Sequence, residues 1–224
     1  ASKFESLSGG MFGVLDPAVL RSARVHAGGF SARYGDALSG VLDLETEGRP
    51  TQRSYRVGVN VVSAGGAART TLGDHAGAWV AVSGTETTAL LAMQGARDEY
   101  PTSPRALQGI ASIIVEPSDA LELRATALRE SDHSSAIAQA LGWEGPITAD
   151  GDTWMTTVSG RLRDERSGSS LSASAGASGR TTGFRFGVLD WEREDRTASL
   201  RLDADRLAAS GRARLRAGVE AALL

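Results

Sequence analysis

Apolar and polar residues alternate with a period of two over much of the chain. The clearest examples are residues 121–127, 171–177, 198–205 and 212–221, where Leu, Ala and Val alternate with charged residues, Ser or Thr. A period of two places side chains of one kind on one face of an extended strand. The pattern therefore predicts amphipathic β-strands rather than amphipathic helices, which need a period of about 3.6.

The alternating segments predict nine strands joined by short and long connections. The expected strands are 52–61, 66–73, 77–85, 106–116, 119–129, 152–163, 168–178, 196–206 and 211–221. The expected short connections are 74–76, 117–118, 164–167 and 207–210, and the long ones are 86–105, 130–151 and 179–195. Short and long connections alternate except at 62–65, as is typical of bacterial outer-membrane barrels. Within the last long connection, Phe184–Val188 also has a strand-like pattern. We interpret it as a strand that extends above the membrane in which such a barrel would lie.

The apolar faces of the predicted strands consist largely of small residues, such as Ala173 and Ala177. A soluble β-sandwich encloses a core about 10 Å thick, which bulky side chains must fill. A membrane barrel instead turns its apolar residues toward fluid lipid and its polar residues toward the lumen. The small residues therefore favour the barrel. Trp79, Trp154 and Trp191 lie near predicted strand ends, as in an interfacial aromatic girdle, although a capping Trp in a soluble sheet is about as common.

Composition narrows the class of protein. The chain has 24 Lys and Arg against 27 Asp and Glu, with both signs interspersed, so nucleic acid is not expected as a partner. It has no cysteine, which excludes disulfides, thiolate metal sites and cysteine nucleophiles. The sequence has no uninterrupted run of about 18 apolar residues, which a transmembrane helix would need.

Residues 1–48 follow a different pattern and predict a small α+β unit. Asp16 can act as a helix N-cap, with Pro17 at the first helical position. Leu20–His26 and Ser39–Thr46 predict two short strands, separated by a glycine-containing segment. We therefore expect this unit to be distinct from the amphipathic strands that follow it.

The segment 20–44 also carries a recognisable motif. A strand leads to Gly28-Gly29-Phe30, then to Ala32-Arg33-Tyr34-Gly35, and finally to the strand Gly40-Val41-Leu42-Asp43. This arrangement resembles the closing half of the plug domain of TonB-dependent outer-membrane receptors. The preceding Phe12–Pro17 resembles a stretch found in members that take up carbohydrates or peptides. The resemblance covers residues 4–48 by motif and 52–221 by pattern.

The resemblance implies a mainly β fold, a transmembrane antiparallel β-barrel of about 22 strands preceded by a plug. Residues 1–48 would be the C-terminal part of the plug, and residues 49–224 the N-terminal strands of the barrel. Nine strands are too few and odd in number, the chain lacks an initial Met, and it stops in mid-pattern, so we expect a fragment of a longer receptor.

The family also implies partners and a location. The parent protein would lie in the outer membrane of a Gram-negative bacterium, in contact with outer-membrane lipid. It would bind a scarce extracellular ligand, which could be a siderophore, cobalamin, a glycan or a peptide. Uptake would follow when TonB, through a segment absent from this chain, pulls on the plug.

The resemblance singles out structural or plug-locking residues, namely Gly28, Gly29, Phe30, Arg33, Tyr34, Gly35 and Gly40. Arg33 matches a family arginine thought to join barrel glutamates and hold the plug, because a guanidinium in a confined lumen needs a carboxylate partner. A solvated turn arginine is an equally good interpretation. The glycines are interpreted as positions that need positive φ or close backbone approach. No residue is assigned to ligand binding.

The sequence gives little support to catalysis, a cofactor or a metal site. His26 lies in a predicted plug strand, His75 in a predicted turn and His133 in a predicted long loop beside Asp132. No two of them have the spacing of zinc ligands, and no nucleophile elbow or phosphate-binding loop is present. An enzyme that uses Asp132, His133 and a nearby serine would rest on adjacency alone.

Asp203 and Asp205 face the same side of a predicted strand and could form a paired-carboxylate site. Their neighbours Arg201, Arg212, Arg214 and Arg216 favour a cross-strand charge ladder on a wet lumen wall instead. The main alternative to the receptor is a soluble all-β domain, adhesin-like or structural, whose strands pack against a partner.

Overall fold

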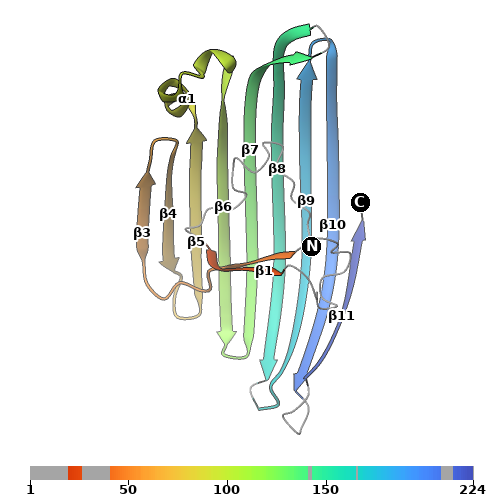
Figure 1. Cartoon of the computed structure of the whole chain (residues 1–224). Helices are drawn as coiled ribbons and strands as arrows, with labels where there is room; N and C mark the ends of the chain where they lie inside the picture. The colour runs from red at the N-terminus through yellow and green to blue at the C-terminus, as the bar shows by residue number, and fades with distance from the viewer. Residues whose placement is uncertain (1–19, 27–40, 141–142, 165, 208–213, 224) are drawn as a thin grey trace.

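The computed structural model describes residues 20–26, 41–140, 143–164, 166–207 and 214–223. Within them, two strands form a small antiparallel sheet and nine form a large one (Figure 1). The small sheet consists of β1 (Leu20–His26) and β2 (Val41–Thr46). The large sheet consists of β3 (Ser54–Val59), β4 (Ser63–Thr71), β5 (Ala76–Glu86), β6 (Thr102–Ser118), β7 (Leu121–Ala140), β8 (Trp143–Asp164), β9 (Ser169–Phe186), β10 (Leu189–Leu207) and β11 (Arg214–Leu223). The mainly β class and the nine amphipathic strands are confirmed.

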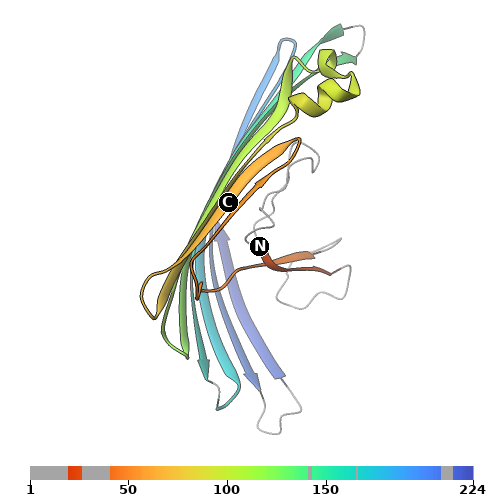
Figure 2. The ribbon, with the colours of Figure 1, turned by 90° about the vertical axis from the view of Figure 1, so that its left-hand side faces the viewer.

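Each strand of the large sheet pairs with the next one along the chain, so the sheet is a simple antiparallel meander. The longest register runs from Leu121 opposite Leu162 to Ala140 opposite Trp143, between β7 and β8. Among the described residues, β3 and β11 are edge strands and do not pair with each other. The described strands therefore form an open, curved wall (Figure 2).

Strands β7 to β10 are longer than the sequence pattern predicts. Residues 130–151 and 179–195 were expected to be loops, but the structure continues β7 to Ala140, begins β8 at Trp143 and joins β9 to β10 through Gly187 and Val188. Gly187 has φ 59°, which a two-residue hairpin turn requires. The strand-like pattern at Phe184–Val188 is confirmed up to Phe186. The loop prediction is wrong because the far ends carry polar residues on both faces, which removes the alternation but not the backbone ladder.

The long connection predicted at 86–105 is confirmed for residues 87–101, whereas Glu86 belongs to β5 and residues 102–105 belong to β6. It contains α1 (Thr88–Gln94) and a 3-10 turn, η2 (Arg97–Glu99). The buried Thr87 hydroxyl donates to the Pro104 carbonyl at 2.9 Å and fixes the start of this connection against β6. Within the described residues, no helix has the length and the apolar character needed to cross a membrane.

The large sheet has two chemically different faces, which the register assigns strand by strand. On one face, which we call the outer face, a cross-strand row runs through Ile113, Ala125, Val158, Ala175 and Leu200. On the opposite, inner face, the adjacent row runs through Ser112, Thr126, Thr157, Gly176 and Ser199. The hairpin of β1 and β2 lies on the concave side of the wall (Figure 2).

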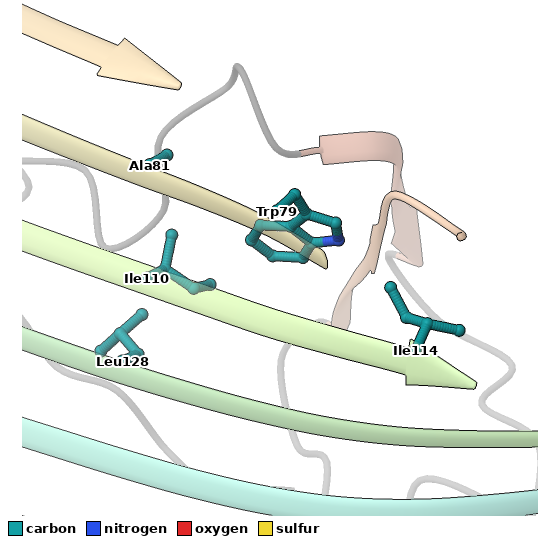
Figure 3. Close-up of a cluster of buried hydrophobic side chains, with 5 residues drawn as sticks. All are labelled: Trp79, Ala81, Ile110, Ile114 and Leu128. Carbon is teal, nitrogen blue, oxygen red and sulfur yellow. The ribbon is translucent and has the colours of Figure 1, made fainter. Parts of the chain in front are cut away.

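A buried apolar cluster lies on the inner face of β5, β6 and β7 (Figure 3). It consists of Trp79, Ala81, Ile110, Ile114 and Leu128, with Ala67 and Met155 packed against it. The segment after β2 closes over its lower side, since a Cβ on Gly77 would come within 2.8 Å of Pro50 Cδ. The inner face therefore holds the buried core, while the outer face has none in the described part of the chain.

Candidate functional site

Large apolar side chains are exposed on the outer face. They include Tyr55, Val57, Val80, Val82, Ile113, Leu123, Val158, Leu162, Leu171, Leu200, Leu202, Leu215 and Val219. Small residues such as Ala175 and Ala177 fill the spaces between them. A continuous apolar surface of this extent marks a face that contacts a partner or a membrane.

Polar rows bound this apolar surface at both ends of the strands. The upper row contains Arg129 and Arg196, and the lower row pairs Asp164 with Ser169. We call the outer-face surface between these rows the apolar band. Trp154 lies in the upper row, as an interfacial aromatic residue would. Trp79 does not fit this role, because its position in the alternation directs it to the inner face, where it is 3% exposed.

Charged side chains on the lower inner face are arranged in a ladder. Arg201 bonds to Asp203 at 2.7 Å on its own strand and to Glu220 at 3.1 Å on β11. Arg216 bonds to Asp205 at 2.9 Å across the same pair of strands. The predicted charge ladder is confirmed for these residues. Arg214 takes the register position opposite Leu207, and Arg212 lies outside the described residues.

Four polar contacts attach the end of β2 and the segment after it to the inner face and its lower edge. Glu47 pairs with Arg69 of β4 at 2.5 Å. Arg49 pairs with Glu116 of β6 at 2.6 Å and also donates to the Asp74 carbonyl at 3.1 Å. The Thr46 hydroxyl accepts a hydrogen bond from Arg124 of β7 at 2.8 Å. The N-terminal segment is therefore fixed to three different strands of the wall.

A second group of polar residues lies on the inner face above the level of the apolar band. One cross-strand row contains Gln108, Glu130, Thr153 and Arg180, and the next contains Asp132, Gly151 and Thr182. Glu130 and Thr182 are both 8% exposed. The side chain of Asp132 lies over Gly151, where any Cβ would collide with it. We call Glu130, Asp132, Arg180 and Thr182 the upper cluster.

The carboxylates of the upper cluster are poorly compensated. Burial raises the pKa of Glu130, the charge of Asp132 raises it further, and Arg180 lowers it. Burial also raises the pKa of Asp132, which Arg180 and His133 lower and Asp150 raises. Neither carboxylate forms a hydrogen bond or ion pair with any described residue, and the buried Arg180 Nε has no hydrogen-bond partner.

His133 is not in a loop, as the sequence suggested, but in the middle of β7. Its Nδ1 bonds to Asp150 on β8, on the outer face and therefore on the side opposite Asp132. The pair borders a hollow of about 650 Å³ above the apolar band, together with Arg105, Asp152, Arg185 and Glu192. Because Asp132 and His133 point to opposite faces, the adjacency that suggested a hydrolytic site does not bring them together.

The other residues that the sequence analysis singled out lie either outside the described residues or in the strands and turns of the described part. Gly28, Gly29, Phe30, Arg33, Tyr34, Gly35 and Gly40 lie outside the described residues, as do Asp16 and Pro17. The strands predicted on either side of that motif are present as β1 and β2, with His26 at the end of β1. His75 lies in the turn before β5, as predicted. In the part of the chain that the structure describes, no group of His, Asp and Glu is arranged to hold a metal ion.

The sequence interpretation missed the attachments of residues 46–49 and the upper cluster. Glu47 and Arg49, two residues apart directly after a short strand, were an available signal for the first. Glu130 and Asp132 were a signal for the second, because residues two apart share a face if the strand continues past residue 129. Comparison of the chain with protein-family models, curated proteins and solved structures finds no match.

Proposed function

We propose that this chain is part of a TonB-dependent outer-membrane receptor that takes up a scarce nutrient. Residues 1–48 would form the closing part of its plug and residues 49–224 the first strands of its barrel. The observation that carries the proposal is the orientation of the two faces. Apolar side chains are exposed on the outer face, while charged side chains and the N-terminal segment occupy the inner face.

The height of the apolar band supports a membrane setting. Trp154 in the upper polar row and Asp164 in the lower one are separated by ten residues of β8. At about 3.3 Å per residue this separation is about 33 Å along the strand. A strand tilt of about 45° reduces it to about 23 Å along the membrane normal, close to the apolar band of about 25 Å in outer-membrane barrels.

The attachments on the inner face support a plug. Arg69 and Arg124 each have about a fifth of their side-chain surface exposed, and each bonds to a group from residues 46–47. Arg124 also pairs with Glu122, and its buried Nε has no hydrogen-bond partner among the described residues. Charged groups that are partly withdrawn from water need partners, so the wall and the N-terminal segment complement each other. A plug held by such polar contacts can be released by a pulling force without unfolding the wall.

The proposal is tested by labelling adjacent residues of β9 in the full-length protein. Ala173 and Ala175 face outward in the apolar band, whereas Ser172 and Ser174 face inward. Each would be replaced by cysteine, in a segment that has none, and coupled to a fluorophore. In vesicles containing brominated lipid, labels at 173 and 175 should be quenched strongly and labels at 172 and 174 weakly.

Equal quenching at all four positions would contradict the membrane assignment for this wall. A full-length protein that stays monodisperse in water without detergent, and does not fractionate with outer membranes, would favour the soluble adhesin-like or structural domain instead. In that case the outer face would contact a protein partner. Uptake itself is tested separately, by deleting the plug segment and measuring whether TonB-dependent accumulation of the nutrient is lost.

A further inference from the structure

The upper cluster lies on the inner face and spans three neighbouring strands. β7 contributes Glu130 and Asp132, and β9 contributes Arg180 and Thr182. Between them β8 presents only Thr153 and Gly151. Neighbouring strands lie about 4.8 Å apart, so the backbones of β7 and β9 are separated by about 10 Å across these small residues. Only these small residues of β8 separate the carboxylates of β7 from Arg180 and Thr182 of β9.

Polar groups of the upper cluster lack hydrogen-bond partners among the described residues, as in a binding site without its ligand. Glu130 is 8% exposed, yet its carboxylate accepts no hydrogen bond within the described residues. Arg180 has a buried Nε without an acceptor. On the lower inner face, by contrast, Asp203, Asp205 and Glu220 all have arginine partners. Trp79 Nε1 and Arg124 Nε are also buried without a hydrogen-bond partner among the described residues, but only Arg180 acts on carboxylates that themselves accept no hydrogen bond there. Buried polar groups are normally satisfied, so this combination in the upper cluster needs an explanation.

We propose that the upper cluster binds a ligand through a cationic nitrogen, an ammonium or a guanidinium, placed between Glu130 and Asp132. Two carboxylates and one guanidinium leave a net charge of −1 at the site. Ionised carboxylates only accept hydrogen bonds, and a cationic nitrogen supplies several donors together with the missing charge. Arg180 Nε donates to an acceptor oxygen of the same ligand.

Aromatic residues extend the site upward on the inner face. Phe184 and Trp191 are cross-strand partners, two residues above Thr182 and Arg193 on the same face. Trp191 is 48% exposed. Phe184 on β9 and Trp191 on β10 lie two and three strands away from the carboxylates of β7, so these rings contact a more distant part of an organic ligand and not the nitrogen held by Glu130 and Asp132. This arrangement favours an organic cation over an inorganic one, in agreement with the absence of a metal-binding group among the described residues.

Proton binding gives the site a testable signature. The groups that act on the two carboxylates are Arg180 from β9, His133 from β7 itself and Asp150 from β8. Burial raises the pKa of both carboxyl groups, so protons compete with a cationic ligand in mildly acidic solution. Affinity for a cation should therefore rise with pH, whereas affinity for a neutral hydroxyl compound should not.

The experiment compares two probes of equal size, 3-fluoropropylamine and 3-fluoropropanol, by fluorine NMR titration of the full-length protein in detergent. The amine should bind about tenfold more tightly than the alcohol near neutral pH, as expected for a hydrogen bond to a charged group. The preference should disappear in Glu130→Gln and in Asp132→Asn, and at about pH 4, where carboxyl groups bind protons.

Glu122→Gln is the matched control, because Glu122 is an inner-face carboxylate that already pairs with Arg124 and Arg163. It should keep the full preference for the amine. Gly151→Ala provides a second variant, which displaces Asp132 without changing any charge and should weaken amine binding. Equal binding of both probes, or an amine preference that survives in both carboxamide variants, would overturn the proposal.

This inference rests on the proposed function only for the route by which the ligand arrives. Binding in detergent does not depend on uptake or on TonB. If the labels of β9 report lipid on the outer face while the probes bind equally, only the cationic ligand is disproved. If the amine binds selectively to a protein that does not fractionate with outer membranes, the binding site stands and the receptor proposal is wrong.

Discussion

Trp154 and Gly179 are cross-strand partners on the outer face, and the indole of Trp154 occupies the space where residue 179 would carry a Cβ. A glycine inside a strand leaves the backbone of its neighbour uncovered. Here the indole of Trp154 covers the backbone at Gly179, at the upper edge of the apolar band. The pair therefore gives Trp154 one fixed orientation at the level of the upper polar row.

Gly179→Ala should displace the indole of Trp154 and lower the free energy of unfolding by about 1–3 kcal/mol, because the added methyl group has no room. The measurement is denaturant unfolding of the full-length protein in lipid vesicles. Gly109→Ala is the control, since Gly109 lies in the same cross-strand row with open space at its Cβ position. Equal destabilisation by both variants would contradict the packing role of Trp154.

Leu202→Arg places a charge within the apolar band. If that band faces lipid, the change should cost about 2–4 kcal/mol near the bilayer midplane and impair assembly of the full-length protein in the outer membrane. Arg161→Leu on the inner face should change stability by about 0–1 kcal/mol, since an exposed charge contributes little. Assembly is measured by membrane fractionation and resistance to proteolysis. An unaffected Leu202→Arg variant would count against a lipid-facing surface.

Glu130 and Asp132 should make stability depend on pH in an identifiable direction. Burial raises the pKa of both carboxyl groups in the folded protein. Their favourable contribution is therefore fully present below the unfolded-state pKa and is lost as the pH rises through the folded-state pKa. The free energy of unfolding of the double variant Glu130→Gln, Asp132→Asn, relative to that of the unmodified protein, should therefore rise as the pH increases from acidic to neutral. A difference that does not change with pH would contradict the shifted pKa values.

Arg49 and Glu116 should be energetically coupled. A double-mutant cycle with Arg49→Ala and Glu116→Ala should give a coupling energy of about 1 kcal/mol, because both side chains are partly buried and the contact is short. The same cycle on Arg193 and Asp195, a more exposed pair, should give a smaller value. Unfolding is followed by denaturant titration. Equal coupling for the two pairs would mean that the attachment of the N-terminal segment does not depend on this contact.

The period of two in the sequence was sufficient to predict the fold class, the number of strands in the large sheet, and which residues of β10 and β11 lie on each face. Leu202 and Val219 are cross-strand partners on the outer face, and Asp205 pairs with Arg216 on the inner face, as the alternation requires. Each of these assignments is local. A strand in which one face is apolar and the other is charged reveals its orientation without knowledge of its neighbours.

Only the tertiary structure decided the length of β7 to β10, the face of Trp79 and the contacts that cross the sheet. Beyond Leu128, the residues on both faces of β7 are mostly polar, so alternation no longer distinguishes strand from loop, and the pairing with β8 supplies the information instead. The contacts Glu47–Arg69 and Arg49–Glu116 join positions 22 and 67 residues apart. Sequence periodicity reports which residues share a face, but it carries no information about which distant segments meet there, because that depends on how the whole sheet curves.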